Sequence, residues 1–313
     1  MEEGIQKQRA IFNIGYTCNN NCRFCAIAKT REQVSDLSSD EIKHKIKKAW
    51  QKGAVELIFS GGECSIRPDF IELVKYARNT GFKHIEVTTN GRMFSYEDFS
   101  KKVVRAGLLF IRFSLHGHNA DTHDYLTRAK GSFDEIVQGI KNLIQISKDW
   151  DKYAHSPVYI EVTTAIVEQN YRHLMKIVKL TGNLGINQNN FNFVIPWGSA
   201  WIHKKKMIPK ISDVAKSIRK TIDYDKKHKG IVKKIANIPF CLLEGYGEYI
   251  SEIKEGKIDI INPIGNPFDY QNHRRSKKVL FRKCKNCKYF KVCEGIYFEY
   301  TQLRGSNEFH PIK

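Results

Sequence analysis

The amino-acid sequence predicts an α/β fold built on a parallel sheet. Through residues 1–200 of the 313-residue chain, short apolar runs alternate with longer amphipathic stretches, which is the pattern of successive strand–helix–strand units. Hydrophobic residues make up 41% of the chain, enough to bury a sizeable core, and the sequence contains no internal repeat. The alternation alone allows either a doubly wound sheet or an open six-stranded relative of the (β/α) barrel.

Six strands and five helices are predicted in order through this part of the chain. Apolar runs predict the strands at 10–16, 54–60, 84–89, 109–115, 158–166 and 190–195. Amphipathic stretches predict the helices near 39–52, 68–80, 95–106, 132–149 and 170–181. The alternation stops after Pro196, Trp197 and Gly198, so we expect one domain over residues 1–200 and a second over 201–313.

Residues 201–313 predict a smaller domain of a different kind. A helix is expected near 211–229, followed by a β-hairpin at 247–261 with a Glu-Gly pair, residues 255–256, at its turn. A polar loop is expected over 262–276. A cysteine cluster and a short aromatic helix end the chain.

The chain is basic, and the excess is concentrated toward its end. The formal net charge is +19, of which residues 1–200 carry +6 and residues 201–313 carry +13. Such a basic region attracts nucleic acid, an acidic peptide or an acidic redox partner, unless its lysines only cover solvated helix faces. The first seven residues lack an apolar signal segment and no apolar run is long enough to span a membrane, so we expect a cytoplasmic protein.

Three closely spaced cysteines follow the first predicted strand. Cys18, Cys22 and Cys25 form the pattern C-x-x-x-C-x-x-C. Three thiolates at this spacing can hold three corners of one 4Fe–4S cube and leave the fourth iron open to a bound molecule. A closed zinc site needs four ligands, and only Cys22 and Cys25 form the usual C-x-x-C pair, with no nearby histidine or cysteine to complete it.

Three further motifs come at the ends of predicted strands. They read S-G-G-E at residues 60–63, T-T-N-G at 88–91 and S-L-H-G at 114–117. Together with the three cysteines, and with Phe24 before the last of them, these motifs resemble those of the radical S-adenosylmethionine (radical SAM) superfamily. The resemblance covers roughly residues 10–200 and implies a partial (β/α)6 TIM-like barrel with its chemistry at the carboxyl ends of the strands.

The resemblance implies two cofactors and a radical reaction. In similar enzymes the 4Fe–4S cluster held by the three cysteines binds S-adenosylmethionine at its open iron. An electron from the reduced cluster breaks the S–C5′ bond, and the resulting 5′-deoxyadenosyl radical removes a hydrogen atom from the substrate. A reducing partner such as flavodoxin or ferredoxin is therefore expected.

The resemblance also assigns contacts to S-adenosylmethionine. The residues expected to contact it are Phe24, Gly61, Gly62, Glu63, Asn90, Ser114, His116, Arg128, Val194 and Ile195. The two glycines permit close approach of the backbone, and Glu63 suits the ammonium group of the cofactor, although a Gly-Gly pair also serves a plain turn. Asn90, Ser114 and His116 are expected at the ribose and carboxylate, where many relatives carry Asp in place of His116.

Four residues each have two interpretations. Arg128 pairs with the cofactor carboxylate or lies on an exposed loop. Val194 and Ile195 pack on adenine or belong to the core. Cys64 stands where relatives usually have proline after G-G-E; it is either a catalytic thiol that donates a hydrogen atom to a substrate radical or a small buried residue in the place of the proline.

A second cysteine group lies near the end of the chain. Cys284, Cys287 and Cys293 form C-x-x-C-x5-C, with Cys241 upstream, and four thiolates can close a second 4Fe–4S cluster or a zinc ribbon. The order resembles the auxiliary-cluster extensions called SPASM and twitch. SPASM extensions carry a further cysteine where this chain has Tyr297, so we expect one auxiliary 4Fe–4S cluster.

The resemblance predicts an enzyme that modifies a peptide, since members with auxiliary clusters often mature ribosomally made peptides. An enzyme of cofactor or metabolite biosynthesis, acting on a small molecule, and a tRNA-modifying enzyme are alternatives with the same mechanism. A non-enzymatic iron–sulfur or nucleic-acid-binding module is disfavoured, because an electron carrier needs no cofactor cleft. We expect a peptide or small-molecule substrate, do not favour nucleic acid, and expect no membrane partner.

Overall fold

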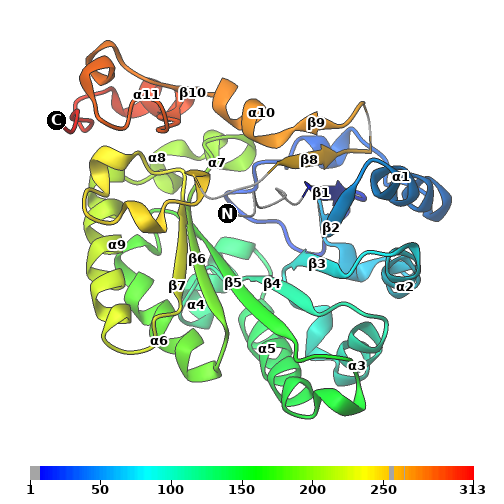
Figure 1. The fold of residues 1–313 in the computed structure, drawn as a ribbon. Helices are drawn as coiled ribbons and strands as arrows, with labels where there is room; N and C mark the ends of the chain where they lie inside the picture. The colour runs from blue at the N-terminus through cyan, green and yellow to red at the C-terminus, as the bar shows by residue number, and fades with distance from the viewer. Residues whose placement is uncertain (1–7, 254–256, 264) are drawn as a thin grey trace, which may run out of the picture.

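The computed structural model describes residues 8–253, 257–263 and 265–313. Within these residues a nine-stranded sheet has the order β7-β6-β5-β4-β3-β2-β1-β8-β9, and helices lie along its outer face (Figure 1). Strands β1 to β8 run parallel to their neighbours, and β9 is antiparallel to β8. The predicted α/β fold with a partial barrel is therefore confirmed.

The six predicted strands are all present, with ends that differ from prediction by at most about three residues. They are β1 (Gln8–Asn13), β2 (Ala54–Ser60), β3 (His84–Thr89), β4 (Phe110–Ser114), β5 (Tyr159–Ile166) and β6 (Gln188–Phe193). Strand β1 ends early because the N–H groups of Tyr16 and Thr17 donate to Asp36 Oδ1, at 2.6 and 3.2 Å, instead of to a neighbouring strand.

The predicted helices are also present. They are α1 (Ser39–Gln51), α2 (Phe70–Thr80), α3 (Glu97–Arg105), α5 (Ser132–Lys148), α6 (Leu174–Leu184) and α9 (Ile211–Lys226). The sequence pattern missed α4 (Ala120–Thr127), whose eight residues are mostly polar and too few to show a helical period. Two short helices, α7 (Gly198–Ile202) and α8 (Lys204–Met207), follow β6.

The predicted hairpin at 247–261 is wrong. Residues 247–253 form two short 3-10 turns, and the expected turn at 255–256 lies outside the described residues. Strand β8 (Ile258–Ile261) instead pairs with β1 and with β9 (Phe268–Asp269). Its apolar side chains are buried because β1 offers an open sheet edge to which the strand adds.

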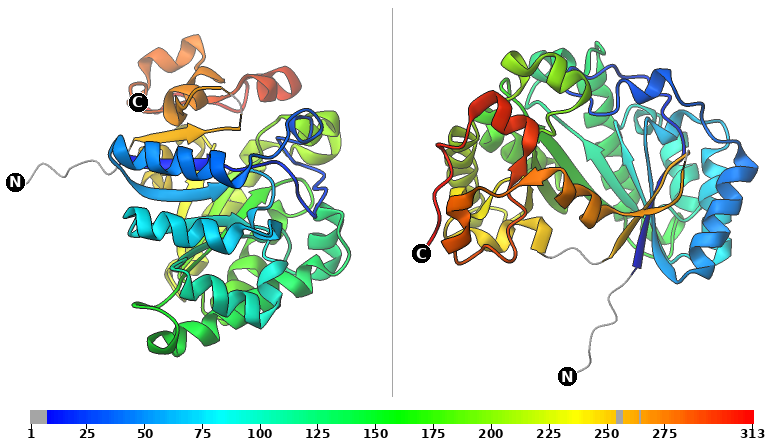
Figure 2. Two further views of the ribbon diagram at one scale, coloured as in Figure 1. Left: turned by 90° about the vertical axis from the view of Figure 1, so that its right-hand side faces the viewer. Right: turned by 90° about the horizontal axis from the view of Figure 1, so that it is seen from above.

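The polar loop predicted over 262–276 is only partly a loop, because it contains β9 and α10 (Tyr270–Ser276). The chain then forms a two-stranded sheet of β10 (Lys278–Val279) and β11 (Ile296–Tyr297), and the predicted aromatic helix is α11 (Phe298–Arg304). Figure 2 shows this C-terminal segment packed against one side of the barrel. The domain boundary at residue 200 stays a prediction, since β7 (Val232–Ala236) and β8 extend the same sheet.

The two faces of the sheet have different chemistry. On β5, Ile160, Val162 and Ile166 are buried beneath the outer helices, whereas Thr163 and Ala165 line the barrel interior. This alternation follows from the two-residue period of a strand. No helix in the described ranges is long and apolar enough to cross a membrane.

Candidate active site

The three cysteines of the first motif lie together at the carboxyl end of the barrel. Cys18, Cys22 and Cys25 line one cavity of about 220 Å³ in the loop that follows β1. The short helix α4 holds this loop in place, because the N–H groups of Asn21 and Arg23 donate to its last carbonyl groups at 3.0 and 2.9 Å. The helix that the sequence pattern missed is thus part of the site.

Two glycines of the S-G-G-E motif allow β2 to pack against the start of this loop. A Cβ atom on Gly61 would lie 2.2 Å from the carbonyl oxygen of Gly15, and one on Gly62 would lie 2.2 Å from that of Thr17. Gly61 also has a φ of +120°, which side chains disfavour. The glycines are therefore needed for the contact between two backbone segments, in addition to any contact with a cofactor.

Glu63 joins the ends of β2 and β3. Its carboxylate accepts hydrogen bonds from Ser65 N–H and Oγ–H, from Thr89 Oγ1–H, and from the Asn90 N–H at 2.6 Å. Burial raises the pKa of this carboxyl by more than the hydrogen bonds lower it, so the pKa lies above its usual value. Four donors match the roughly four lone-pair sites of a carboxylate, so Glu63 fixes the shape of the loops around the cavity.

Arg31 is a residue of the site that the sequence analysis missed. Its guanidinium lines the cysteine cavity and donates to the carbonyl groups of Asn20 and Cys18 at 3.0 and 2.9 Å. Burial raises the pKa of Cys22 to about 12, and the charge of Arg31 acts in the opposite direction. A cation beside three thiols favours the thiolate forms that bind metal. No sequence motif marks this arginine.

His116 is held in one tautomer. Its Nδ1 accepts the N–H of Ala165 at 3.2 Å, so the ring proton lies on Nε2. Burial holds the pKa of this histidine well below its usual value, so the ring is neutral. It packs edge-on against Phe24, with ring centroids 4.7 Å apart, and lines the cysteine cavity together with Asn90 and Ser114. The Nε2–H is therefore the polar group that this ring has left for a ligand.

Two predicted residues are not brought to the cavity. Arg128 is exposed at the end of α4, with φ +55°, and lines neither the cysteine cavity nor the barrel interior. Cys64 is buried in the hydrophobic core, and its thiol donates to the Ser60 carbonyl at 3.2 Å. Its placement favours the packing interpretation over hydrogen-atom donation.

A second cavity of about 410 Å³ occupies the barrel interior beside the first. The two cavities share Phe24, Cys25 and Thr88 in their linings. Val194 and Ile195 line the second cavity. Val194 is also buried within the hydrophobic core, so both interpretations of these two residues stay open.

The four cysteines of the second group also lie together. Cys241, Cys284, Cys287 and Cys293 line a small apolar cavity of about 30 Å³ that is otherwise mostly aromatic and aliphatic. Burial, with a further contribution from the other three thiols, raises the pKa of Cys241 to about 11. The prediction that these cysteines belong to one site agrees with this arrangement.

The donor chemistry of both groups fits iron–sulfur clusters, which thiolates hold. All eight cysteines are free thiols. Within the described part of the chain, no three His, Cys, Asp or Glu residues are arranged to hold a single metal ion. The metal ligands therefore stay predictions.

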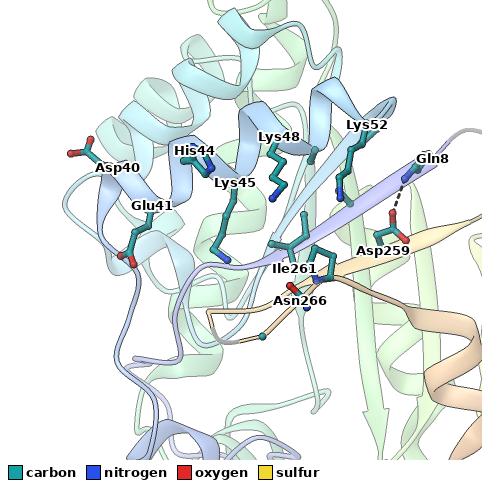
Figure 3. Close-up of a pocket in the computed structure, with 15 residues that line it drawn as sticks. Gln8, Asp40, Glu41, His44, Lys45, Lys48, Lys52, Asp259, Ile261 and Asn266 are labelled. Atoms are coloured by element: carbon teal, nitrogen blue, oxygen red, sulfur yellow. Dashed lines mark hydrogen bonds between the residues drawn. The ribbon is translucent and has the colours of Figure 1, made fainter.

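A third cavity lies outside the barrel, between α1 and the β8–β9 edge. It has a volume of about 450 Å³ and contains none of the predicted site residues. Figure 3 shows lysines of α1 extending into it. Its charged lining residues are Lys45, Lys48, Lys52, Asp40, Glu41 and Asp259. Among the described residues these formal charges sum to zero.

The fold and the cysteine-lined cavity define a barrel enzyme of the iron–sulfur class. The family model of the radical SAM superfamily matches residues 12–188, more than half of the chain. The chain belongs to the radical SAM superfamily, whose enzymes use a 4Fe–4S cluster and S-adenosylmethionine. The predicted family and enzyme class are confirmed, while the individual site residues and the auxiliary cluster stay predictions.

Curated relatives cover most of the chain. The chain is 26% identical to a probable GTP 3′,8-cyclase of Saccharolobus solfataricus over 274 residues, which are 88% of this chain and 80% of that protein. It is 31% identical to an AdoMet-dependent heme synthase of Methanosarcina barkeri over 182 residues, which are 58% and 49% of the two proteins.

Solved structures share the fold over nearly the whole chain. The match to SuiB of Streptococcus suis, bound to the precursor peptide SuiA, covers 98% of this chain and 75% of the SuiB chain. Its TM-score is 0.67, and the two sequences are 14% identical. The match to native anSMEcpe with bound AdoMet and Cp18Cys peptide covers 97% of this chain and 92% of the anSMEcpe chain. Its TM-score is 0.65, and the two sequences are 16% identical.

Proposed function

We propose that the protein cleaves S-adenosylmethionine in the cysteine cavity and removes a hydrogen atom from a substrate held in the barrel interior. The observation that carries this proposal is that the two cavities share Phe24, Cys25 and Thr88. When bound, the cluster supplies the electron that breaks the S–C5′ bond. A cofactor held in the first cavity would lie next to a substrate held in the second.

The residues of the chain have separate roles in this proposal. The cysteines hold the cluster, with Arg31 beside their thiolates. The backbone of the glycine pair lies against the cluster loop, and His116 offers its Nε2–H to the ribose or carboxylate of the cofactor. Val194 and Ile195 pack on adenine. Four thiols near the C-terminus hold an auxiliary cluster.

For the substrate we favour a small molecule of cofactor or metabolite biosynthesis. The interior cavity of about 410 Å³ lies in the range of ordinary ligand pockets. Two curated relatives, the probable GTP cyclase and the heme synthase, are named for small-molecule reactions. A peptide remains the second candidate, because two structures with the same fold hold peptides.

The test is anaerobic turnover by the reconstituted protein with dithionite. We expect 5′-deoxyadenosine from the wild type and none from Cys22→Ala. Deuterium transfer into 5′-deoxyadenosine from labelled GTP, or from a labelled peptide, separates the two substrate candidates. A wild type that forms no more 5′-deoxyadenosine than Cys22→Ala would refute the proposed function.

A further inference from the structure

Among the described residues, the charged side chains that line the barrel interior all have the same sign. They are Arg9, Arg112, Lys234 and Arg274, and none of the described aspartates or glutamates lines this cavity. A cavity whose charged lining is entirely cationic raises the local concentration of anions. The strength of this effect depends on which of the four cations already form ion pairs with carboxylates of the protein.

Two of the three arginines, Arg9 and Arg112, form ion pairs with glutamates of neighbouring strands. Arg9 pairs with Glu56 at 2.6 Å. Arg112 pairs with Glu86 and Glu161, each at 2.8 Å, which brackets one guanidinium between two carboxylates. These ion pairs connect neighbouring strands and hold the wall of the barrel in shape.

Arg274 is neutralised in the same way. It forms a two-point pair with Glu294, with both N–O distances 2.8 Å, and its side chain is 3% exposed. Three of the four cations are therefore compensated by carboxylates, and their donors are largely used within the protein.

Lys234 differs from the three arginines. It lies on β7, opposite Asn190 of β6, and its side chain lines the cavity. Among the described residues its ammonium group makes no ion pair and no hydrogen bond. An ammonium without a protein partner beside a cavity keeps its full charge for a ligand.

Asn192 lies next to this lysine on the same face of the sheet. In β6 it is two residues from Asn190, which is the register partner of Lys234, so the two side chains are diagonal neighbours. Its amide also lines the cavity and has no hydrogen-bond partner among the described side chains. An ammonium and an amide at this separation supply several N–H donors to one anionic group.

Resting on the proposed function, we propose that Lys234 and Asn192 bind an anionic group, carboxylate or phosphate, of the substrate in the barrel interior. The paired arginines shape the wall, and Lys234 supplies the charge that selects the ligand. The substrate class is therefore an acidic small molecule, oriented with its anionic end toward β7. Lys234 is a specificity-determining residue in this scheme.

The test is calorimetric titration of the reconstituted enzyme with two probes, inorganic pyrophosphate and glutarate. Saturating S-adenosylmethionine is present without reductant, so that the first cavity is filled. The variants are Lys234→Met and Asn192→Ala. Lys233→Met is the matched control, because this lysine is the neighbour on β7 and is exposed on the opposite face.

We expect one probe to bind the wild type, about tenfold weaker binding by Lys234→Met, and unchanged binding by Lys233→Met. The probe that binds distinguishes phosphate from carboxylate. Equal losses in the two lysine variants, or no binding of either probe to the wild type, would overturn the assignment. Turnover is measured separately. Binding of the probe without formation of 5′-deoxyadenosine would refute only the proposed function.

Discussion

At the scale of single residues, Cys64 shows how burial decides between chemistry and packing. Its side chain is 2% exposed, it belongs to the hydrophobic core, and its thiol is already bonded to the Ser60 carbonyl. Burial keeps its pKa well above the usual value, so it is a neutral thiol. A group enclosed in this way has no open path to a substrate in the barrel.

We therefore expect Cys64→Ala to lower the free energy of unfolding by about 1 kcal/mol and to leave the product unchanged. Urea unfolding measures the first effect, and product analysis after turnover measures the second. Solvent deuterium that enters the wild-type product but not the Cys64→Ala product would show that the thiol is a hydrogen donor after all.

A second residue-scale prediction concerns His123, which burial keeps neutral with a pKa of about 3. Its Nδ1 accepts a hydrogen bond from the backbone N–H of His116 at 3.1 Å. In the unfolded chain a histidine takes up a proton below pH of about 6.5. Its contribution to stability is therefore complete above that pH and is lost as the pH falls toward 3.

As the pH falls from 7 to 5.5, protonation of this histidine in the unfolded chain should lower the free energy of unfolding by about 1 kcal/mol. His123→Asn keeps an acceptor for the N–H of His116 and removes the titrating ring, so the loss should shrink by that amount. Urea unfolding at the two pH values compares this variant with the wild type.

At the scale of elements, the approach of β2 to the cluster loop sets a backbone requirement. Gly61→Ala combines a positive φ with a Cβ 2.2 Å from a carbonyl oxygen, whereas Gly230 has φ +61° and open space around its Cβ position. We expect Gly230→Ala to cost about 1 kcal/mol. Gly61→Ala should cost more and should also lower the iron content of the reconstituted protein. Equal costs and equal iron contents would contradict the proposed packing.

The elements that the sequence predicted are those whose pattern is local. Strand β3 was predicted to the residue, because Ile85 and Val87 alternate with polar residues at the two-residue period of a strand. Strand β8 was assigned to a hairpin because its true partner, β1, is about 250 residues away in sequence. The cysteines and strand-end motifs also have local signatures, whereas Arg31 reaches the site only through the fold of its loop.

At the scale of the whole molecule, a buried ion-pair network links the barrel interior to the second cysteine group. Lys278 pairs with Glu252 at 3.2 Å and with Glu294 at 2.9 Å, and the ammonium-bearing side chain is 1% exposed. Glu294 follows Cys293 directly and also pairs with Arg274 of the barrel interior. The cysteine group is thus fixed relative to the cavity in the barrel interior.

Breaking this network should be costly. Lys278→Met removes the cation shared by the buried Glu252 and Glu294, of which Glu294 keeps Arg274, and we expect a loss of about 3 kcal/mol in the free energy of unfolding. The neighbouring Lys277 is exposed, and Lys277→Met should change stability by less than about 0.5 kcal/mol. Similar values for the two variants in urea unfolding would show that the network contributes little.

The two cysteine groups together predict the metal content of the whole molecule. Seven of the eight cysteines line two separate cavities, three in one and four in the other. Two 4Fe–4S clusters require about eight irons. We expect about four irons after Cys18, Cys22 and Cys25 are all replaced by alanine, and about four after Cys241 and Cys293 are replaced.

The two multiple variants should differ in function although they hold the same amount of iron. The first should lose all cleavage of S-adenosylmethionine, because it lacks the cluster beside the cofactor cavity. The second should still cleave it, because that cavity is intact. Cys64→Ala is the matched control and should keep about eight irons, since its thiol lies in the core. Iron and sulfide analysis with zinc determination measures each protein, and a wild type with about four irons and one zinc would remove the auxiliary cluster while leaving the first cluster in place.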